Sequence, residues 1–380
     1  MNHSALEQRV RQTILELEGA GLRRRLQPPS GIDFSSNDYL GLSTHPFVKQ
    51  KMTDAVMKEG CGSTGSRLLR GNRESFRSVE RRFARFKRTE AALYFGSGYA
   101  ANLSVLSTFV ERHDLVFSDD HNHASIIDGI RLSRAKRIKF PHCDLDRVVR
   151  LLREAPSNVQ KFLVTESLFS MDGDFAPLAA YAGICRETGA ALIVDEAHAV
   201  GIYGDRGSGW VEQTGTEDGV FLTVNTAGKA LGAAGAFVAG PDWAIDYLIQ
   251  RARPFIFSTA PPPPIAAALD ASLTVIRDEP ERRSELFRKS SLLRRLIAES
   301  GLEIQASNSQ IIPVVLRDNE RACSAAEELQ REGFDVRALR PPTVPAGTAR
   351  LRITVNADLD DATLRRFALS LGKVCSTVCS

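Results

Sequence analysis

The sequence has 380 residues, of which 43% are hydrophobic and 25% are charged, and its formal net charge is +3. This is the composition of a globular protein of two or three domains, and the small net charge argues against a protein dedicated to nucleic acid. The six cysteines form no CxxC pair and no apolar run reaches membrane-spanning length, so we expect a cytoplasmic protein without a membrane partner.

The N-terminal region is expected to begin with an amphipathic helix. Leu6, Val10 and Ile14 recur at helical spacing within residues 4–19. Three consecutive arginines then begin at Arg23. These arginines are either solvent-exposed charges or a binding site for the anionic tail of a substrate. Further on, residues 74–87 again have a helical pattern, after a loop rich in Gly, Ser and Arg.

Strand-like apolar runs alternate with helical segments through the middle of the chain. This alternation predicts an α/β fold with a mainly parallel sheet covered by helices on both faces. The runs lie at residues 92–95, 115–117, 137–140, 161–165, 191–194, 220–224 and 236–239.

The last third of the chain has a different pattern. Residues 265–300 have a long helical pattern that follows a run of four prolines, and a smaller α+β unit begins near Leu302. We therefore expect three parts: an N-terminal helix and arm at 1–45, a large α/β domain at 46–280, and a small C-terminal α+β domain at 281–380.

Polar side chains follow two of the predicted strands. The run 191–194 ends in Asp195, with His198 just beyond, and the run 220–224 is followed by Thr226 and Lys229. In open α/β sheets, ligands bind beyond the carboxyl ends of the strands. A carboxylate, an imidazole, a hydroxyl and an amine in one crevice suit a cofactor with a basic ring nitrogen, a phenolic oxygen, a phosphate and an aldehyde. Pyridoxal phosphate has all four.

Lys229 lies in a stretch of small and apolar residues, TAGKALG. Burial there would favour its neutral, nucleophilic amine. The alternative is a lysine whose charged end reaches solvent. A phosphate-binding GxxxxGK[ST] loop is excluded, because Thr223 stands at the first glycine position and Ala230 at the Ser/Thr position.

Asp195 could keep a pyridine nitrogen protonated, although a helix cap or a salt bridge would also explain a carboxylate at a strand end. The surrounding Asp-Glu-Ala-His also matches a helicase motif. That interpretation requires an upstream GK[ST] loop, which the sequence lacks.

Other candidate sites are less specific. Asp119, Asp120, His121 and His123 have metal-ligand chemistry, but no distant ligand group stands out, and we expect no metal. The turn Gly-Ser-Gly-Tyr at 96–99 would offer free N–H groups to an anion, or it has glycines for geometry alone. Arg340, Arg350 and Arg352 either bind a substrate carboxylate or are surface charges.

The sequence resembles the α-oxoamine synthases, a family of fold type I pyridoxal-phosphate enzymes, from about residue 20 to residue 370. The resemblance depends on many motifs in order: SSNDYLGLS, GSRLLRGN, GSGYAAN, NHASIIDG, ESLFSMDGD, IVDEAHAVG, GKALG, FSTA and RPPTVPAGTARLRIT.

The resemblance implies a role for each matching residue. It implies that Lys229 carries the cofactor covalently, that Asp195 pairs with the ring nitrogen, that His198 contacts the phenolic oxygen and that His123 stacks on the ring. The remaining implied contacts are Gly98, Tyr99, Thr226 and, from a second subunit, Thr259 for the phosphate, Ser170 for the cofactor, and Arg23, Asn37, His123, Arg340, Thr343 and Arg352 for the substrate.

The resemblance also implies a decarboxylating condensation of an amino acid with an acyl-CoA, catalysed by a homodimer. The C-terminal motif and the arginines near Arg23 favour a member that uses L-alanine with pimeloyl-CoA or pimeloyl-acyl carrier protein. Alternatives in the family are 2-amino-3-oxobutyrate ligase and serine palmitoyltransferase. A non-catalytic pyridoxal-phosphate sensor is the alternative outside enzymes.

Overall fold

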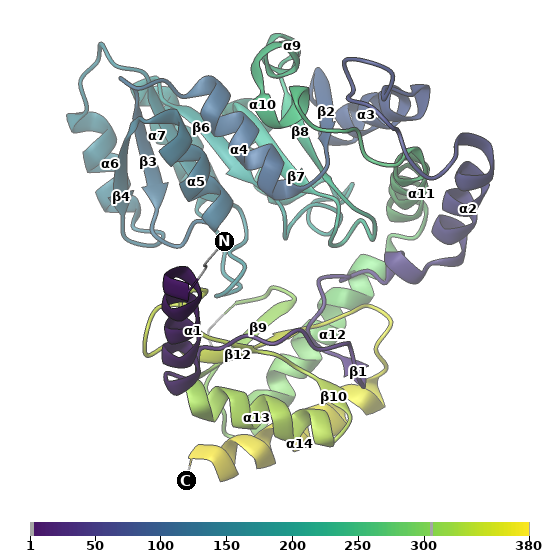
Figure 1. Cartoon of the computed structure of the whole chain (residues 1–380), viewed down its shortest axis with the longest axis vertical. Coiled ribbons are helices and arrows are strands. Elements are labelled where there is room, and N and C mark those ends of the chain that lie inside the picture. The colour runs from purple at the N-terminus through teal and green to yellow at the C-terminus, as the bar shows by residue number, and fades with distance from the viewer. Residues whose placement is uncertain (1–3, 305–306, 380) are drawn as a thin grey trace. The chain divides into compact units, whose positions relative to one another are not determined.

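The computed structural model describes residues 4–304 and 307–379, and these residues form two compact units (Figure 1). The large unit contains residues 37–170 and 174–285. The small unit contains the described residues up to Ser36, residues 171–173, and the described residues from Leu286 onward. The described residues up to Ser36 thus belong to the same unit as the C-terminal part. The expected division into three parts at 45 and 280 stays a prediction.

Within the described residues, a seven-stranded sheet forms the centre of the large unit. Strand β8 is antiparallel to both of its neighbours, and the other pairings are parallel. The predicted mainly parallel sheet is thereby confirmed. In spatial order the strands are β2 (Ala91–Phe95), β8 (Ala236–Gly240), β7 (Leu222–Thr226), β6 (Ala191–Asp195), β5 (Lys161–Glu166), β3 (Leu115–Asp119) and β4 (Lys136–Phe140).

Most strands of this sheet are buried on both faces, which explains why they are continuous apolar runs, while the edge strand β4 (KRIKF) is largely accessible. Val116 and Ile193 belong to a core cluster on one face, while Phe117 and Leu192 belong to a cluster on the other. Alternate residues of a strand point to opposite faces. Helices α4 (Gly98–Phe109), α5 (Ala124–Ser133), α9 (Asp242–Arg251) and α10 (Arg253–Ile256) contribute to the first cluster, and α6 (Leu145–Glu154), α7 (Leu178–Thr188) and α8 (Trp210–Gln213) to the second.

Three further helices complete the large unit: α2 (Pro46–Glu59), α3 (Glu74–Lys87) and α11 (Pro263–Asp278). Helix α3 has the predicted bounds, and its buried Phe83 stacks on Phe237 of β8 with ring centroids 4.1 Å apart.

The single helical segment expected at 265–300 is wrong. Helix α11 ends at Asp278, and α12 (Glu281–Glu299) begins just after Pro280. Proline interrupts a helix because it has no N–H and its ring collides with the preceding turn.

The small unit contains a three-stranded antiparallel sheet in the order β11 (Ala338–Leu339), β12 (Ala349–Thr354) and β9 (Ile311–Arg317), within the described residues. A short parallel pair joins β1 (Ile32–Asp33) to β10 (Phe334–Asp335). Helices α13 (Asn319–Arg331) and α14 (Asp361–Cys379) contact each other, and Phe367 of α14 stacks on Phe34 at 3.9 Å.

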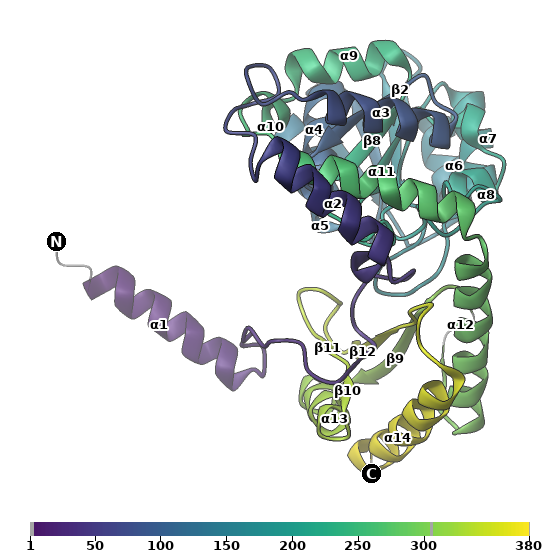
Figure 2. The same cartoon turned by 90° about the vertical axis from the view of Figure 1, so that its right-hand side faces the viewer.

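Helix α1 (Ser4–Gly19) has the predicted bounds, and its ribbon stands apart from the other elements of the small unit in Figure 2. None of its residues is buried. Its apolar side chains are exposed, including Leu6 at 51% and Leu15 at 61%. Within the described part of the chain, no helix combines the length and the apolar character needed to cross a bilayer.

Candidate active site

The large unit brings several predicted site residues to one edge of its sheet. Asp195 is the last residue of β6 and Thr226 the last of β7, and Lys229 lies in the turn that follows. Strands β2 and β7 run in the same direction, because both are antiparallel to β8. The turn after β2, which leads into α4 at Gly98, therefore reaches the same edge.

A chain of polar contacts runs from Lys229 to Asn37. Lys229 Nζ lies 2.6 Å from His198 Nε2, and His198 Nδ1 lies 2.6 Å from the hydroxyl of Tyr39. The Tyr39 hydroxyl donates to Asn37 Oδ1 at 2.9 Å. His198 and Tyr39 are buried, so their rings are held in place. The structure thus connects the predicted lysine, the predicted histidine and the predicted Asn37.

A second network connects Asp195 to His123. Asn102 Nδ2 donates to Asp195 Oδ2 at 2.7 Å and to Ser125 Oγ at 2.9 Å, and Ser125 Oγ lies 2.7 Å from His123 Nδ1. The other oxygen of Asp195 accepts from the Ala197 N–H at 2.9 Å. Both oxygens of Asp195 therefore accept a hydrogen bond.

The imidazole of His123 is biased toward its neutral form. Burial lowers the pKa of His123, the Asp195 charge raises it, and the Lys229 charge lowers it again. A neutral ring suits stacking on an aromatic cofactor. His123 also caps α5, since its Nδ1 accepts from the Ser125 N–H at 3.3 Å.

The start of α4 forms a cradle with no room for a side chain. A Cβ on Gly98 would lie 2.4 Å from Thr226 Oγ1. Ser97 caps the helix by accepting from the Ala100 N–H at 3.1 Å. Free N–H groups and the helix dipole at such an end attract anions, with the dipole contributing roughly 0.3–1 kcal/mol. Tyr99 is 42% exposed, and its hydroxyl bonds to Asp128.

Two other predicted cofactor contacts also lie in the large unit. Ser170 is buried, and its backbone N–H approaches the carboxyl of Glu166. Thr259 is exposed and pairs with Ser66 in an isolated antiparallel bridge. An exposed Thr259 is compatible with the predicted contact to a second subunit.

The other predicted substrate residues belong to the small unit, and three of them lie together. Arg23, Arg340 and Thr343 line a groove of about 510 Å³, together with Arg24 and other residues. Arg23 forms an ion pair with Glu18 at 2.6 Å. Arginines outnumber acidic residues in the groove lining, although Glu18 pairs with both Arg23 and Arg25.

The remaining clamp candidates are buried. Arg352 lies on β12 opposite Pro313 and is 8% exposed. Arg350 forms a buried ion pair with Asp172 at 2.6 Å, so Arg350 already has a partner within the protein.

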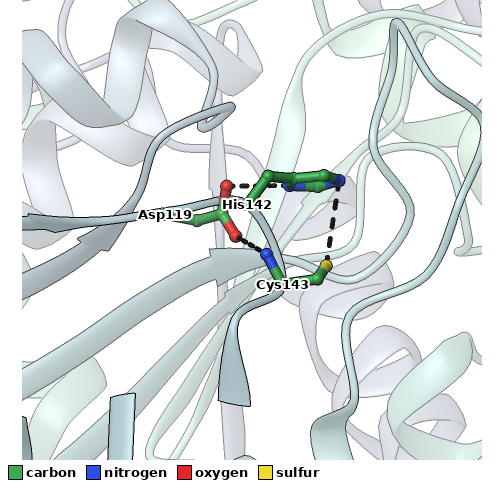
Figure 3. Close-up of side chains that lie close together, drawn as sticks. All are labelled: Asp119, His142 and Cys143. Carbon is green, nitrogen blue, oxygen red and sulfur yellow. Dashed lines mark hydrogen bonds and ion pairs between the residues drawn. The ribbon is translucent and has the colours of Figure 1, made fainter. Parts of the chain in front are cut away.

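The structure does not gather the four metal-ligand candidates into one site. In the described residues, Asp119 instead meets His142 and Cys143 (Figure 3). His142 Nδ1 lies 2.9 Å from Asp119 Oδ1, and its Nε2 lies 2.8 Å from Asp174 Oδ2. Hydrogen bonds to these two carboxylates raise the pKa of His142 to about 12 despite its burial. Each ring nitrogen of His142 therefore faces a carboxylate oxygen.

A buried ion pair supports the segment after β6. Lys87 bonds to Glu196, with side chains 2% and 0% exposed, and Lys87 Nζ also donates to the Ser208 carbonyl at 2.6 Å. Glu196 Oε1 accepts from the Val211 N–H at 3.0 Å. Because Glu196 directly follows Asp195, this pair fixes the backbone that carries the site carboxylate.

Sequence reasoning missed Tyr39, Asn102, Ser125 and Glu166. Each lies inside a motif that was singled out for another residue: SSNDYLGLS, GSGYAAN, NHASIIDG and ESLFSMDGD. The available signal was a polar side chain within a short ordered motif. The contacts themselves join positions far apart in the sequence, such as Tyr39 and His198.

Comparison with known proteins agrees with this geometry. The family model described as aminotransferase class I and II matches residues 29–371. The chain belongs to this family. An 8-amino-7-oxononanoate synthase of Anaeromyxobacter dehalogenans is 45% identical over 371 residues, which cover 94% of this chain and 93% of that one.

Two solved structures are also similar over nearly the whole chain. A serine palmitoyltransferase from S. paucimobilis, solved with PLP and myriocin bound, has a TM-score of 0.92 and 28% identity, and the match covers 100% of this chain and 99% of that chain. An 8-amino-7-oxononanoate synthase of Francisella tularensis has a TM-score of 0.79 and 30% identity, covering 92% and 98%.

These findings confirm the resemblance to the α-oxoamine synthases, the fold type I architecture and pyridoxal phosphate as the cofactor. The protein is a pyridoxal-phosphate-dependent acyltransferase. The residues of the large unit fit this cofactor: an amine at Lys229, a carboxylate at Asp195, an imidazole at His123 and an anion cradle at Gly98. The individual residue roles stay predictions.

Proposed function

We propose that the protein condenses L-alanine with a pimeloyl thioester, carried by CoA or by acyl carrier protein, and forms 8-amino-7-oxononanoate for biotin biosynthesis. The observation that carries this proposal is the identity to relatives of that name along almost the whole chain. The polar networks around Lys229 and Asp195 support it, because this condensation needs a movable proton and a stable anion at one site.

The cofactor supplies an electron-accepting ring that stabilises negative charge on the Cα of the amino acid. We assign two tasks to Lys229: holding the cofactor covalently and moving the Cα proton, with His198 2.6 Å away as its hydrogen-bonding partner. Asp195 would favour a proton on the ring nitrogen of the bound cofactor, and each pKa unit that it added there would correspond to about 1.4 kcal/mol. His123 covers one face of the ring site.

A carbon–carbon bond forms between Cα of alanine and the thioester carbonyl carbon, and the carbon–sulfur bond breaks as the thiol leaves. The bond from Cα to its carboxylate then breaks and releases CO2. A proton returns to Cα, and the amino ketone leaves. We assign binding of the amino-acid substrate to Asn37, His123, Thr343, Arg340 and Arg352.

The acyl end of the substrate is assigned to the small unit. A pimeloyl chain ends in a carboxylate, and Arg23 lines a groove with several other arginines. Arginine suits a carboxylate because its planar fork donates two parallel hydrogen bonds. A plain alkyl chain would gain nothing from this charge.

A steady-state panel of L-alanine, glycine and L-serine against pimeloyl-, acetyl- and palmitoyl-CoA tests the proposal. We expect the highest kcat/KM for L-alanine with the pimeloyl thioester. Arg23→Ala should raise the KM for that thioester about tenfold or more, because an ionic hydrogen bond is lost. Arg11→Ala, on the exposed face of α1, is the matched control. A preference for glycine with acetyl-CoA would refute the assignment.

A second candidate is condensation of serine with palmitoyl-CoA. The structural similarity to a serine palmitoyltransferase favours it. The same panel decides between the two, since the arginine-lined groove favours an acyl chain that ends in a negative charge.

We also propose a homodimer in the cytoplasm. Exposed apolar side chains such as Leu69, Phe257 and those of α1 support a second copy as partner.

The thiols of Cys61, Cys143, Cys185 and Cys323 suit a reducing compartment.

A further inference from the structure

Glu166 lies beside the site carboxylate although no chemical role has been assigned to it. It is the last residue of β5 and the register partner of Asp195 on β6. Paired residues of neighbouring parallel strands point their side chains to the same face of the sheet. Glu166 is 3% exposed and Asp195 is 5% exposed, so two buried carboxyl groups are neighbours.

The two carboxyl groups differ in their hydrogen bonds. Asp195 receives donors at both oxygens, from Asn102 and from the Ala197 N–H. Glu166 is approached by the backbone N–H groups of His123 and Ser170, but within the described residues its Oε1 has no hydrogen-bond partner. A buried oxygen without a donor favours a proton on that oxygen.

Electrostatics point in the same direction. Burial and then the Asp195 charge raise the pKa of Glu166 to about 8, against the lowering effects of Lys229 and of the two backbone N–H groups. Two negative charges close together in a buried site cost free energy. Because the two acids have different surroundings, one of them is expected to be ionised and the other neutral.

We propose that Glu166 is a positioning residue of the cofactor site: a neutral carboxylic acid at pH 7 that holds the backbone at His123 and Ser170 and leaves Asp195 as the ionised member of the pair. The inference rests on the proposed roles of Asp195, His123 and Ser170. An ionised Glu166 would compete with Asp195 for the proton of the ring nitrogen. A neutral Glu166 leaves that proton to Asp195.

Infrared spectroscopy of the purified full chain tests the protonation state without any turnover. At pH 7 the wild type should show the carbonyl band of a protonated carboxylic acid, which fades as the pH rises through about 8. Glu166→Gln should lack the band, whereas Glu154→Gln, at an exposed position in α6, should keep it. A wild type without the band at pH 7 would overturn the proposal even if the enzyme makes the expected product.

Stability gives the second measurement. The folded chain keeps a proton that the unfolded chain releases between about pH 4.5 and 8, so stability falls across that window. Urea unfolding should show the wild type losing stability relative to Glu166→Gln as the pH rises. Equal pH profiles would contradict a neutral Glu166.

Cofactor binding tests the positioning role. Glu166→Leu removes the acceptor for the two N–H groups and should weaken pyridoxal-phosphate binding about tenfold, while Glu166→Gln should stay within about twofold of the wild type. The absorbance of the bound cofactor should change in the Leu variant and be restored in the Gln variant. Unchanged affinity in Glu166→Leu, or equal loss in both variants, would refute this role.

Discussion

At the start of α4, Thr226 lies so close to Gly98 that no side chain fits at position 98. The two residues come from different strand ends, and a Cβ on Gly98 would lie 2.4 Å from Thr226 Oγ1. Their contact brings the first N–H groups of α4 close to a hydroxyl. Backbone N–H groups and a hydroxyl can both donate hydrogen bonds to a phosphate.

Gly98→Ala should therefore weaken pyridoxal-phosphate binding by about tenfold or more, because either Thr226 or the start of α4 must move away from the phosphate. Titration of the cofactor-free chain with pyridoxal phosphate, followed by absorbance, measures this. Gly183→Ala is the matched control, since a Cβ there meets nothing within 4 Å. Equal affinities in the two variants would show that the cradle does not hold the phosphate.

Contacts between residues far apart in the sequence could not be predicted from the sequence alone. The positions of Asp195, His198, Thr226 and Lys229 followed from apolar runs that end in polar residues. Tyr39 could not be found in this way, because its hydroxyl meets His198 across 159 positions of sequence. Local spacing carries no information about such a contact.

At the scale of elements, the apolar runs predicted the strands well because all strands of the large sheet except the edge strand β4 are mostly buried. The exceptions have physical causes. The run 220–224 becomes β7 at Leu222–Thr226, since pairing with β8 continues through the polar Asn225 and Thr226. The break between α11 and α12 at Pro280 was missed because the helical pattern continues on both sides.

The segment after β6 depends on the ion pair between Lys87 of α3 and Glu196. Lys87→Met should destabilise the protein by about 3–5 kcal/mol, because it leaves Glu196 buried and unpaired. Urea unfolding measures this loss, and Lys87→Met combined with Glu196→Gln should recover most of it. Arg153→Met breaks an ion pair whose side chains are each 61% exposed and should leave stability almost unchanged. Equal losses in the two single variants would contradict a special role for the buried pair.

The loops after β3 and β5 are joined by His142, which contacts Asp119 and Asp174 (Figure 3 shows the first contact). Cys143 and the stacked ring of His121 also face it. The pKa of His142 is raised from 6.5 to about 12, so its stabilising contribution is complete below about pH 6.5 and is lost as the pH rises toward 12.

His142→Asn should accordingly lower the free energy of unfolding most at acidic and neutral pH, and the difference from the wild type should shrink as the pH rises. Urea unfolding between pH 6 and pH 10 measures it. The same exchange at His113, an exposed position just before β3, is the control. A difference that grows with pH would contradict a charged His142.

At the scale of the whole molecule, the proposed active site includes a residue from a second copy of the chain. Thr259 is exposed and pairs with Ser66 in an isolated antiparallel bridge. If Thr259 serves the partner's phosphate site, one subunit's Lys229 and the other's Thr259 belong to the same active site.

Mixing two impaired variants tests this sharing. Lys229→Ala and Thr259→Ala should each lose activity, and subunit exchange between them should restore about a quarter of the wild-type activity, because half of the dimers then contain one intact site. Lys229→Ala mixed with Lys229→Met is the control and should stay inactive. A mixture no more active than its components would contradict a shared site.

The central claim is that the cofactor is bound covalently to Lys229. Borohydride reduction of the purified protein with pyridoxal phosphate, followed by peptide mass spectrometry, tests it most directly. The account predicts a single labelled peptide that carries the reduced cofactor on Lys229 and disappears in Lys229→Ala. A protein that takes up no label, or takes it up on another lysine such as Lys87, would contradict it.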